Sequence, residues 1–298
     1  MVFCAATCPP RSEKGRWVLL RLVWLFFGWA VQSPGAVRAA EGDSYPLAVA
    51  GGGGKLFIAD RGNATVWLLE GKEVKPHFQG SPKFRTPLNA VRCLTVAPDG
   101  SLMAGDSSTR EVYRFDALAK PIGVTGGKIG IPMDIAVAAN GDLFVADLEL
   151  HTVFRVDAKS GTTEVHVKVP APRGVAIDSQ NRLWVVSHGK SPLLRVLPDK
   201  SIEKVVEDPV FQFAHQVRVH ANGDAFVSDG YGKCVWRIPA SGSPSKLDSG
   251  DKLINPVGLH IEGNSLWIAD PRASAIFRWD LTQPTKDSLE VVHRFGER

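Results

Sequence analysis

The sequence predicts an all-β protein, a six-bladed β-propeller made of four-stranded antiparallel blades. Three observations support this. One alternating pattern recurs six times along the chain, its spacing stays near forty residues, and each copy has room for four short strands. A fixed period of this length is typical of repeat architectures. Radial repetition of four-stranded sheets leaves only short, protected strand edges.

The repeat is clearest from Gly141 to Asp157. The other copies are Lys55–Glu70, Ser101–Asp116, Asn181–Leu197, Gly223–Pro239 and Asn264–Asp280. The first strand of each copy closes, in order, with Asp60, Asp106, Asp147, Ser187, Asp229 or Asp270, which gives steps of 46, 41, 40, 42 and 41 residues. We expect the recurring aspartate to be a short acceptor that caps backbone N–H groups of the strand connection.

The two middle strands of each blade follow from alternation with a period of two. In the clearest copy we expect one face to carry Leu143, Val145, Val153 and Arg155, and the other Phe144, Ala146, Phe154 and Val156. Large apolar residues fill corresponding positions in nearly every copy, which is how stacked sheets fill the space between them. The arginines at Arg114, Arg155, Arg195, Arg237 and Arg278 are expected to make surface or inter-blade contacts.

An innermost strand precedes each copy and is usually introduced by proline. The six begin at Pro46, Val91, Pro132, Pro172, Ala214 and Pro256. A fourth, less regular strand follows each copy, as in Thr163 to Val169. An open solenoid is the main alternative architecture. It is disfavoured because neither end of the array reads as a polar capping repeat.

Residues 1–39 read as a cleavable signal peptide. Basic residues precede a run of about ten apolar residues, Leu22 to Val31, and small residues at Val37 and Ala39 suit a signal-peptidase site. The run is too short for a helix that spans a bilayer core of about 30 Å. We therefore expect a secreted or periplasmic protein without stable membrane insertion after cleavage, with residues 40–298 as a single propeller domain. An uncleaved anchor is the alternative.

The formal net charge changes when the leader is removed. It contains five of the 35 Lys and Arg residues and one of the 31 Asp and Glu residues, so residues 40–298 have a formal net charge of zero. The basic pI therefore gives no support for nucleic-acid binding. Cys93 and Cys234 lie three repeats apart, which is too far for a disulfide, and are expected to be buried free thiols. We expect a monomer.

The repeat, with an apolar-Val-Ala-Asp strand end followed by Val-aromatic-Arg-apolar-Asp, resembles the NHL repeat. Six such copies over residues 44–295 are similar to the NHL and SMP-30/gluconolactonase-like propellers, which serve as binding platforms, lactonases and lyases. In the lactonase-like relatives a Glu, Asn residues and an Asp bind a divalent metal. This chain has Met133, Arg173 and His215 near those positions, so we expect no metal and no cofactor.

A weaker, local resemblance is to the peptidyl-hydroxyglycine amidating lyase, another six-bladed NHL-type enzyme. It rests on Asp60-Arg61, the segment Asp147 to Arg155, and Asp229-Gly-Tyr231. The family's zinc uses histidines from the innermost strands of separate blades, whereas this chain offers only His215 there. Enzymatic activity stays uncertain, and in the hydrolase or lyase alternative His215, His151 and Tyr231 are the candidate acid–base residues.

The predicted site is the channel mouth, where the innermost strands begin. We call the second residue of each predicted inner strand an entrance residue, and the six are Leu47, Arg92, Met133, Arg173, His215 and Val257. Connections that share this face add Arg61, Tyr231 and Arg272 as candidate ligand contacts. This set predicts a site for an anionic small molecule or a protein partner. In the rival interpretation Arg92 and Arg173 pair with Asp134 and loop acids, and in the rival function the propeller is a hydrolase or lyase.

Overall fold

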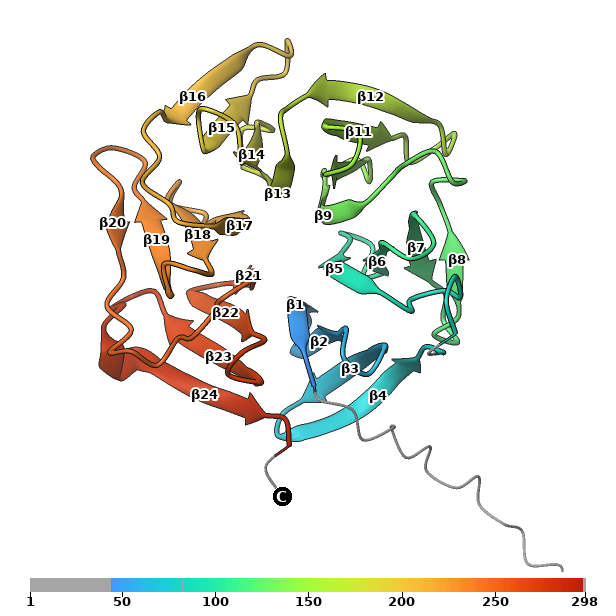
Figure 1. Cartoon of the computed structure of the whole chain (residues 1–298), viewed down its shortest axis with the longest axis horizontal. Helices are drawn as coiled ribbons and strands as arrows, with labels where there is room; N and C mark the ends of the chain where they lie inside the picture. The colour runs from blue at the N-terminus through green and yellow to red at the C-terminus, as the bar shows by residue number, and fades with distance from the viewer. Residues whose placement is uncertain (1–43, 82, 297–298) are drawn as a thin grey trace, which may run out of the picture. The chain divides into compact units, whose positions relative to one another are not determined.

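The computed structural model describes residues 44–81 and 83–296, which form a ring of six four-stranded antiparallel sheets (Figure 1). In each sheet the strand order follows the chain, from the innermost strand beside the central axis to the outermost strand at the rim. The predicted six-bladed propeller is thus confirmed. The leader expected over residues 1–39 lies outside the described residues. Within the part of the chain that is described, no helix has the length and apolar character of a membrane span.

Each blade consists of four strands that are consecutive in the chain. Blade 1 is β1 (Pro46–Gly52), β2 (Lys55–Asp60), β3 (Thr65–Glu70) and β4 (Glu73–Gln79); blade 2 is β5 (Val91–Val96), β6 (Leu102–Asp106), β7 (Glu111–Phe115) and β8 (Pro121–Gly123); blade 3 is β9 (Pro132–Val137), β10 (Leu143–Asp147), β11 (Thr152–Val156) and β12 (Thr163–Lys168). Blade 4 is β13 (Pro172–Ile177), β14 (Leu183–Ser187), β15 (Leu193–Val196) and β16 (Ile202–Val206); blade 5 is β17 (Ala214–Val219), β18 (Ala225–Asp229), β19 (Cys234–Ile238) and β20 (Ser245–Lys246); blade 6 is β21 (Gly258–Glu262), β22 (Ser265–Asp270), β23 (Ala275–Asp280) and β24 (Leu289–Arg294), with a short 3-10 helix at Lys286–Ser288.

The core lies between neighbouring blades, where the apolar faces of adjacent sheets meet. Between blades 2 and 3 it contains Leu143 and Val145 together with Phe154 and Val156. These four residues share a face because Leu143 pairs with Val156 and Val145 with Phe154 across the β10–β11 ladder. The sequence-based assignment of Val153 and Arg155 to that face was therefore wrong. The four-residue connection sets the register, and it places directly paired residues on one side of the sheet.

The ring closes by side-chain packing between the first and last blades. All four strands of blade 1 come from the first part of the described chain and all four of blade 6 from its end. Val49 and Ile58 of blade 1 pack with Ile276 of blade 6 in one buried cluster. At its edge the rings of Trp67 and Phe295 lie 6.0 Å apart. Closure thus rests on apolar contacts between the blades, and β24 adds Val292 to this cluster.

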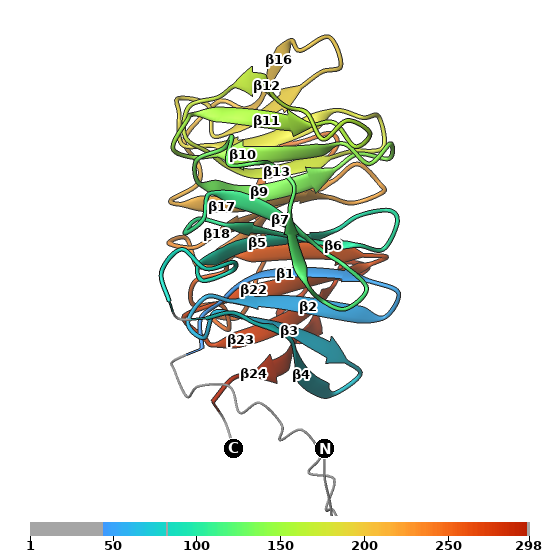
Figure 2. The ribbon, with the colours of Figure 1, turned by 90° about the vertical axis from the view of Figure 1, so that its right-hand side faces the viewer.

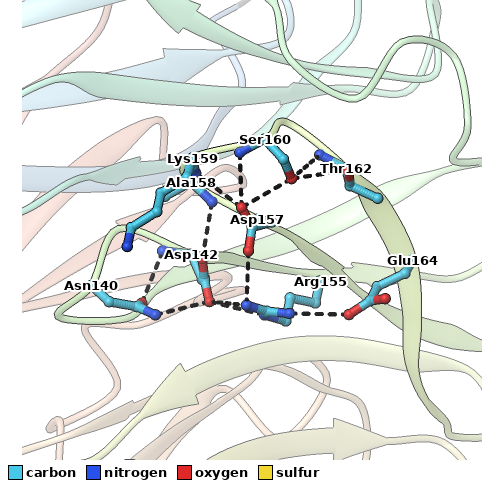
Figure 3. A network of polar contacts seen from close by, with 9 residues as sticks. All are labelled: Asn140, Asp142, Arg155, Asp157, Ala158, Lys159, Ser160, Thr162 and Glu164. Atoms are coloured by element: carbon cyan, nitrogen blue, oxygen red, sulfur yellow. Dashed lines mark hydrogen bonds and ion pairs between the residues drawn. The ribbon is translucent and has the colours of Figure 1, made fainter.

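The strands run from one face of the ring to the other, and the connections gather on these two faces (Figure 2). We call the face where the innermost strands begin the entrance face. The opposite face carries hairpin turns whose charges pair with one another, as blade 3 illustrates (Figure 3). There Arg155 contacts Asp142 at 2.7 Å and Asp157 and Glu164 at 3.1 Å each. This agrees with the surface contacts expected for the recurring arginines.

Candidate functional site

The six entrance residues meet at one cavity of about 160 Å³ on the axis of the ring. Leu47, Arg92, Met133, Arg173, His215 and Val257 all line it. Tyr45, Arg61, Gln216 and Asn255 complete the lining. We call this space the channel cavity. One side chain from each blade reaches it because the six inner strands start at equivalent points around the axis.

The recurring aspartates hold the entrance residues in place. In blade 5, Asp229 accepts hydrogen bonds from the N–H of Gly232 in its own turn (2.9 Å) and from the N–H of Phe213 (2.8 Å). Phe213 stands two residues before the entrance residue His215. The same N–H, two residues before the entrance residue, is bound by Asp60 in blade 1, Asp106 in blade 2, Asp147 in blade 3 and Asp270 in blade 6. The expected capping role is confirmed, and it ties the two kinds of entrance-face loop together.

Blade 4 differs because Ser187 replaces the aspartate. The Ser187 hydroxyl donates to the carbonyl of Pro170 at 2.7 Å, which leaves the N–H of Ala171 without its usual carboxylate. That N–H, two residues before Arg173, instead donates to Nδ1 of His151 from blade 3, at 2.9 Å. His151, a sequence-predicted acid–base candidate, is exposed and lies outside the channel cavity. Its Nδ1 atom instead binds the backbone of the segment that leads to Arg173.

Positive charge dominates the channel cavity. Arg61, Arg92 and Arg173 line it, and no carboxylate is among its described lining residues. The Nε atoms of Arg92 and Arg173 are buried and have no hydrogen-bond partner within the described chain. Burial lowers the pKa of both guanidinium groups, and the charge of Arg61 lowers the pKa of Arg92 further. The two side chains remain cationic at neutral pH, so the cavity concentrates unpaired positive charge.

The carboxylate expected to pair with Arg92 and Arg173 in the rival interpretation has another partner. Asp134 is fully buried and binds Arg218, with Oδ2 and Nη1 2.8 Å apart. Its other oxygen accepts from Nε2 of Gln216 at 3.0 Å. Gln216 Oε1 in turn accepts from the N–H of Leu259 at 2.7 Å. This network fixes the Gln216 amide against the channel cavity and leaves the two entrance arginines without Asp134.

His215 sits in the channel cavity as an uncharged imidazole. Burial, helped by the charges of Arg173 and His188, lowers its pKa to about 3. A side chain at Gly230 would collide with this ring, since a Cβ there would lie 2.7 Å from His215 Nε2 and 2.7 Å from Asn255 Nδ2. The glycine lets the β18–β19 connection approach the cavity. At neutral pH His215 therefore offers one donor and one acceptor, and no charge.

An aromatic cluster borders the cavity on the side of blade 5. Its centre is Phe213, whose ring has the guanidinium carbon of Arg173 4.5 Å from its centroid. The rings of His188, His215 and Tyr231 lie 4.6, 5.0 and 4.7 Å from that of Phe213. Tyr231 is at the rim and is 57% exposed. We call Phe213 and Tyr231 the rim aromatics.

Of the residues predicted for the site, the structure brings Arg92, Arg173, His215 and Arg61 together. Tyr231 stands beside them, and Arg272 lies on the surface outside the lining. Sequence reasoning did not identify Phe213, Gln216, Asn255 or Tyr45. Phe213, Tyr45 and Asn255 each stand two residues before an entrance residue, and this shared spacing could have identified them. Among the described residues, no group of three or more histidine, cysteine, aspartate or glutamate side chains could hold a metal ion.

Comparison with known proteins establishes the fold. No protein-family model matches the sequence, and no curated protein sequence matches it. Among solved structures, the virginiamycin B lyase from Staphylococcus aureus is similar at 17% identity and a TM-score of 0.64, with 87% of each chain covered. A gluconolactonase from Xanthomonas campestris is 15% identical with a TM-score of 0.65, covering 84% of this chain and 88% of that one. A chain in a nidogen/laminin complex is 17% identical with a TM-score of 0.62, covering 80% and 89%.

Proposed function

We propose that this protein binds a small anionic group in the channel cavity, with Arg92 and Arg173 as its principal contacts. The observation that carries the proposal is the pair of buried, unpartnered Nε atoms in a cavity whose described lining includes no carboxylate. A guanidinium group can grip a carboxylate, phosphate or sulfate through two parallel hydrogen bonds. An anion between the two arginines would also offset their mutual repulsion, which is stronger in a partly desolvated site than in water.

The size of the cavity limits what it can enclose. At about 160 Å³ it is smaller than the roughly 300 to 1,000 Å³ of pockets that surround drug-sized ligands. It suits an inorganic anion, a small carboxylate or the anionic group of a larger molecule or protein partner. Arg61, His215 and Asn255 would be the flanking donors. The proposal includes export to the cell exterior or periplasm, which rests on the sequence of residues 1–39.

Calorimetric titration with phosphate, sulfate and acetate at about 150 mM ionic strength tests the proposal. Hydrogen bonds to charged groups are worth about 1.5 to 3 kcal/mol each, so an Arg92→Ala/Arg173→Ala variant should bind at least tenfold more weakly than wild type. The matched control is Lys233→Ala/Arg272→Ala, which removes the same charge from the same face outside the cavity. The proposal fails if no anion binds wild type more tightly than the arginine double variant.

A hydrolase or lyase is the second candidate function. It is favoured by the uncharged imidazole of His215 beside two guanidinium groups, which could stabilise an oxyanion that develops during the reaction. A pKa of about 3 makes His215 a weak base, since an efficient general base has a pKa nearer to the working pH. This candidate requires turnover of a lactone or ester that is lost in His215→Ala and kept in His220→Ala.

A further inference from the structure

The rim aromatics differ from ordinary surface residues because one buried carboxylate holds both of them. Asp229 accepts from the N–H of Phe213 and from that of Gly232, which belongs to the turn that carries Tyr231. Its second oxygen accepts from Nε1 of Trp236 at 3.1 Å. The Asp229 hydrogen bonds that position the His215 segment thus also position Phe213 and the turn that carries Tyr231.

The two rings make a continuous surface that leads into the channel cavity. The Tyr231 and Phe213 rings are inclined by only 33°, with centroids 4.7 Å apart. The Arg173 guanidinium lies over the Phe213 ring, so the aromatic surface is directly next to the cationic cavity. Tyr231 nevertheless remains 57% exposed. An aromatic side chain held open to water beside a cationic cavity can stack on a flat apolar group.

The volume of the channel cavity limits which part of a larger ligand it can enclose. A cavity of about 160 Å³ takes the anionic group, which leaves the rest of a larger molecule at the rim. On the Arg173 side of the cavity, the rim carries the rings of Phe213 and Tyr231. We propose that the ligand is an aryl anion, such as an aryl phosphate or arylcarboxylate, whose ring lies on Tyr231 while its anionic group lies between Arg92 and Arg173. This inference rests on the anion site proposed above and names its ligand class.

A matched pair of probes separates the two claims. Inorganic phosphate reports on the anion site alone, and phenyl phosphate reports on the site together with the rim. We expect wild type to bind phenyl phosphate about tenfold more tightly than phosphate in calorimetric titrations. Tyr231→Ala should remove this preference and leave phosphate binding unchanged, whereas Tyr231→Phe should keep both. Phe84→Ala, which removes an aromatic ring 70% exposed on the same face outside the cavity, is the control and should behave as wild type.

Each outcome decides between the claims. If wild type binds neither probe, the proposed anion site is wrong, and the aryl inference falls with it. If phosphate binds and phenyl phosphate binds no more tightly, the anion site stands and the aryl inference is overturned. The aryl inference is also overturned if Tyr231→Ala weakens both probes equally, because Tyr231 would then act through the shape of the cavity.

Discussion

At the scale of single residues, the site depends on hydrogen bonds made at one backbone position per blade. Five blades bind the N–H two residues before the entrance residue with their own aspartate, and blade 4 binds it with His151 from its neighbour. These hydrogen bonds range from buried in blade 6 to exposed in blade 4, and a typical intramolecular hydrogen bond contributes about 0.5 to 1.5 kcal/mol. The entrance side chains are therefore held by groups that do not touch the ligand cavity.

His151→Ala should weaken phosphate binding about three- to tenfold because the Arg173 segment loses its anchor. His151 also has a left-handed backbone (φ 51°), which asparagine tolerates better than most residues. His151→Asn can supply an acceptor at that backbone angle and should restore binding. His220→Ala, a histidine removed from the opposite face, is the control. Calorimetric titration that finds His151→Ala equal to wild type would contradict this positioning role.

The buried histidines predict acid sensitivity. Burial lowers the pKa of His215 to about 3 and that of His260 to about 4, with the nearby charges of Arg173 and Arg218 acting in the same direction. In the unfolded chain both should titrate near 6.5. The unfolded state therefore binds more protons between these values. Stability should be complete above about pH 6.5 and should fall as the pH drops toward 4.

At pH 5 each of these two histidines should cost about 2 kcal/mol of unfolding free energy relative to pH 7, from about 1.36 kcal/mol per pKa unit. Denaturant unfolding of wild type, His215→Gln and His260→Gln at both pH values measures this. Each variant should lose about 2 kcal/mol less than wild type on acidification. Burial also lowers the pKa of four further histidines, which are His77, His166, His188 and His293. All variants should therefore keep some acid sensitivity. Equal losses in all three proteins would show that neither ring is buried in its neutral form.

At the scale of strands, the blades could be read from the sequence because each strand carries its own pattern. The recurring aspartate ends the second strand of five blades, as the sequence indicated, and Ser187 ends that of blade 4. The bounds of the weakest strands were not predictable. β20 has only two residues, and β21 begins at Gly258, two residues after the proline expected to open it. These ends depend on contacts with neighbouring segments and not on local alternation.

For the candidate site, the sequence indicated which positions reach the axis but not which side chains contact one another there. Equivalent positions in the repeats identified six of the ten described residues that line the channel cavity, since symmetry alone brings these six to the axis. Symmetry could not indicate that Asp134 binds Arg218, because the repeat pattern places this carboxylate next to the entrance positions and does not say which arginine reaches it. It also could not place Phe213 against Arg173. The two contacts join residues that are 84 and 40 positions apart, and only the packed ring brings them together.

We expect the last strand, β24, to stabilise the closed ring. Deletion of residues 286–298 would remove β24 with buried Leu289 and would also remove Phe295 from its contact with Trp67. Fully buried apolar side chains are worth about 1.5 to 3 kcal/mol each, and the deletion also exposes the edge of β23. We expect a loss of several kcal/mol in unfolding free energy and a tendency to aggregate. Thermal unfolding of the truncated protein measures this loss, and a melting temperature like that of the parent would contradict it.

A milder variant keeps this prediction testable if the truncated protein does not fold. Phe295→Ala leaves every strand in place and removes only the ring that packs against Trp67 and His293. It should lower the unfolding free energy by about 1 to 2 kcal/mol, less than a fully buried phenylalanine would. Glu290→Ala, which changes an exposed side chain of the same strand, is the control for a general effect on β24.

At the scale of the whole propeller, the two faces differ in charge although residues 40–298 are neutral overall. The described entrance-face connections carry nine basic residues, which are Arg61, Lys83, Arg85, Arg110, Lys128, Lys190, Lys233, Lys252 and Arg272, and five acidic ones, which are Glu149, Glu207, Asp208, Asp248 and Asp251. The opposite face carries six basic residues, Lys72, Lys120, Lys159, Arg182, Lys200 and Lys286, and eight acidic ones, Asp99, Asp116, Asp142, Asp157, Asp178, Asp199, Asp224 and Asp287. Such a separation favours the approach of an anion to the channel cavity.

This charge separation predicts that ionic strength controls how much the loops contribute to anion binding. The Debye length is about 30 Å at 0.01 M salt and about 8 Å at 0.15 M, so cations beyond the cavity act on the ligand only at low salt. Lys233→Ala/Arg272→Ala should bind phosphate about two- to fivefold more weakly than wild type at 0.01 M, and equally well at 0.15 M. The opposite-face variant Lys159→Ala/Lys200→Ala, with the same change in net charge, should show the smaller loss at 0.01 M because its charges lie farther from the cavity. Titrations at both salt concentrations measure this. If the two double variants lose affinity equally at low salt, net charge controls binding, and the asymmetry between the faces does not.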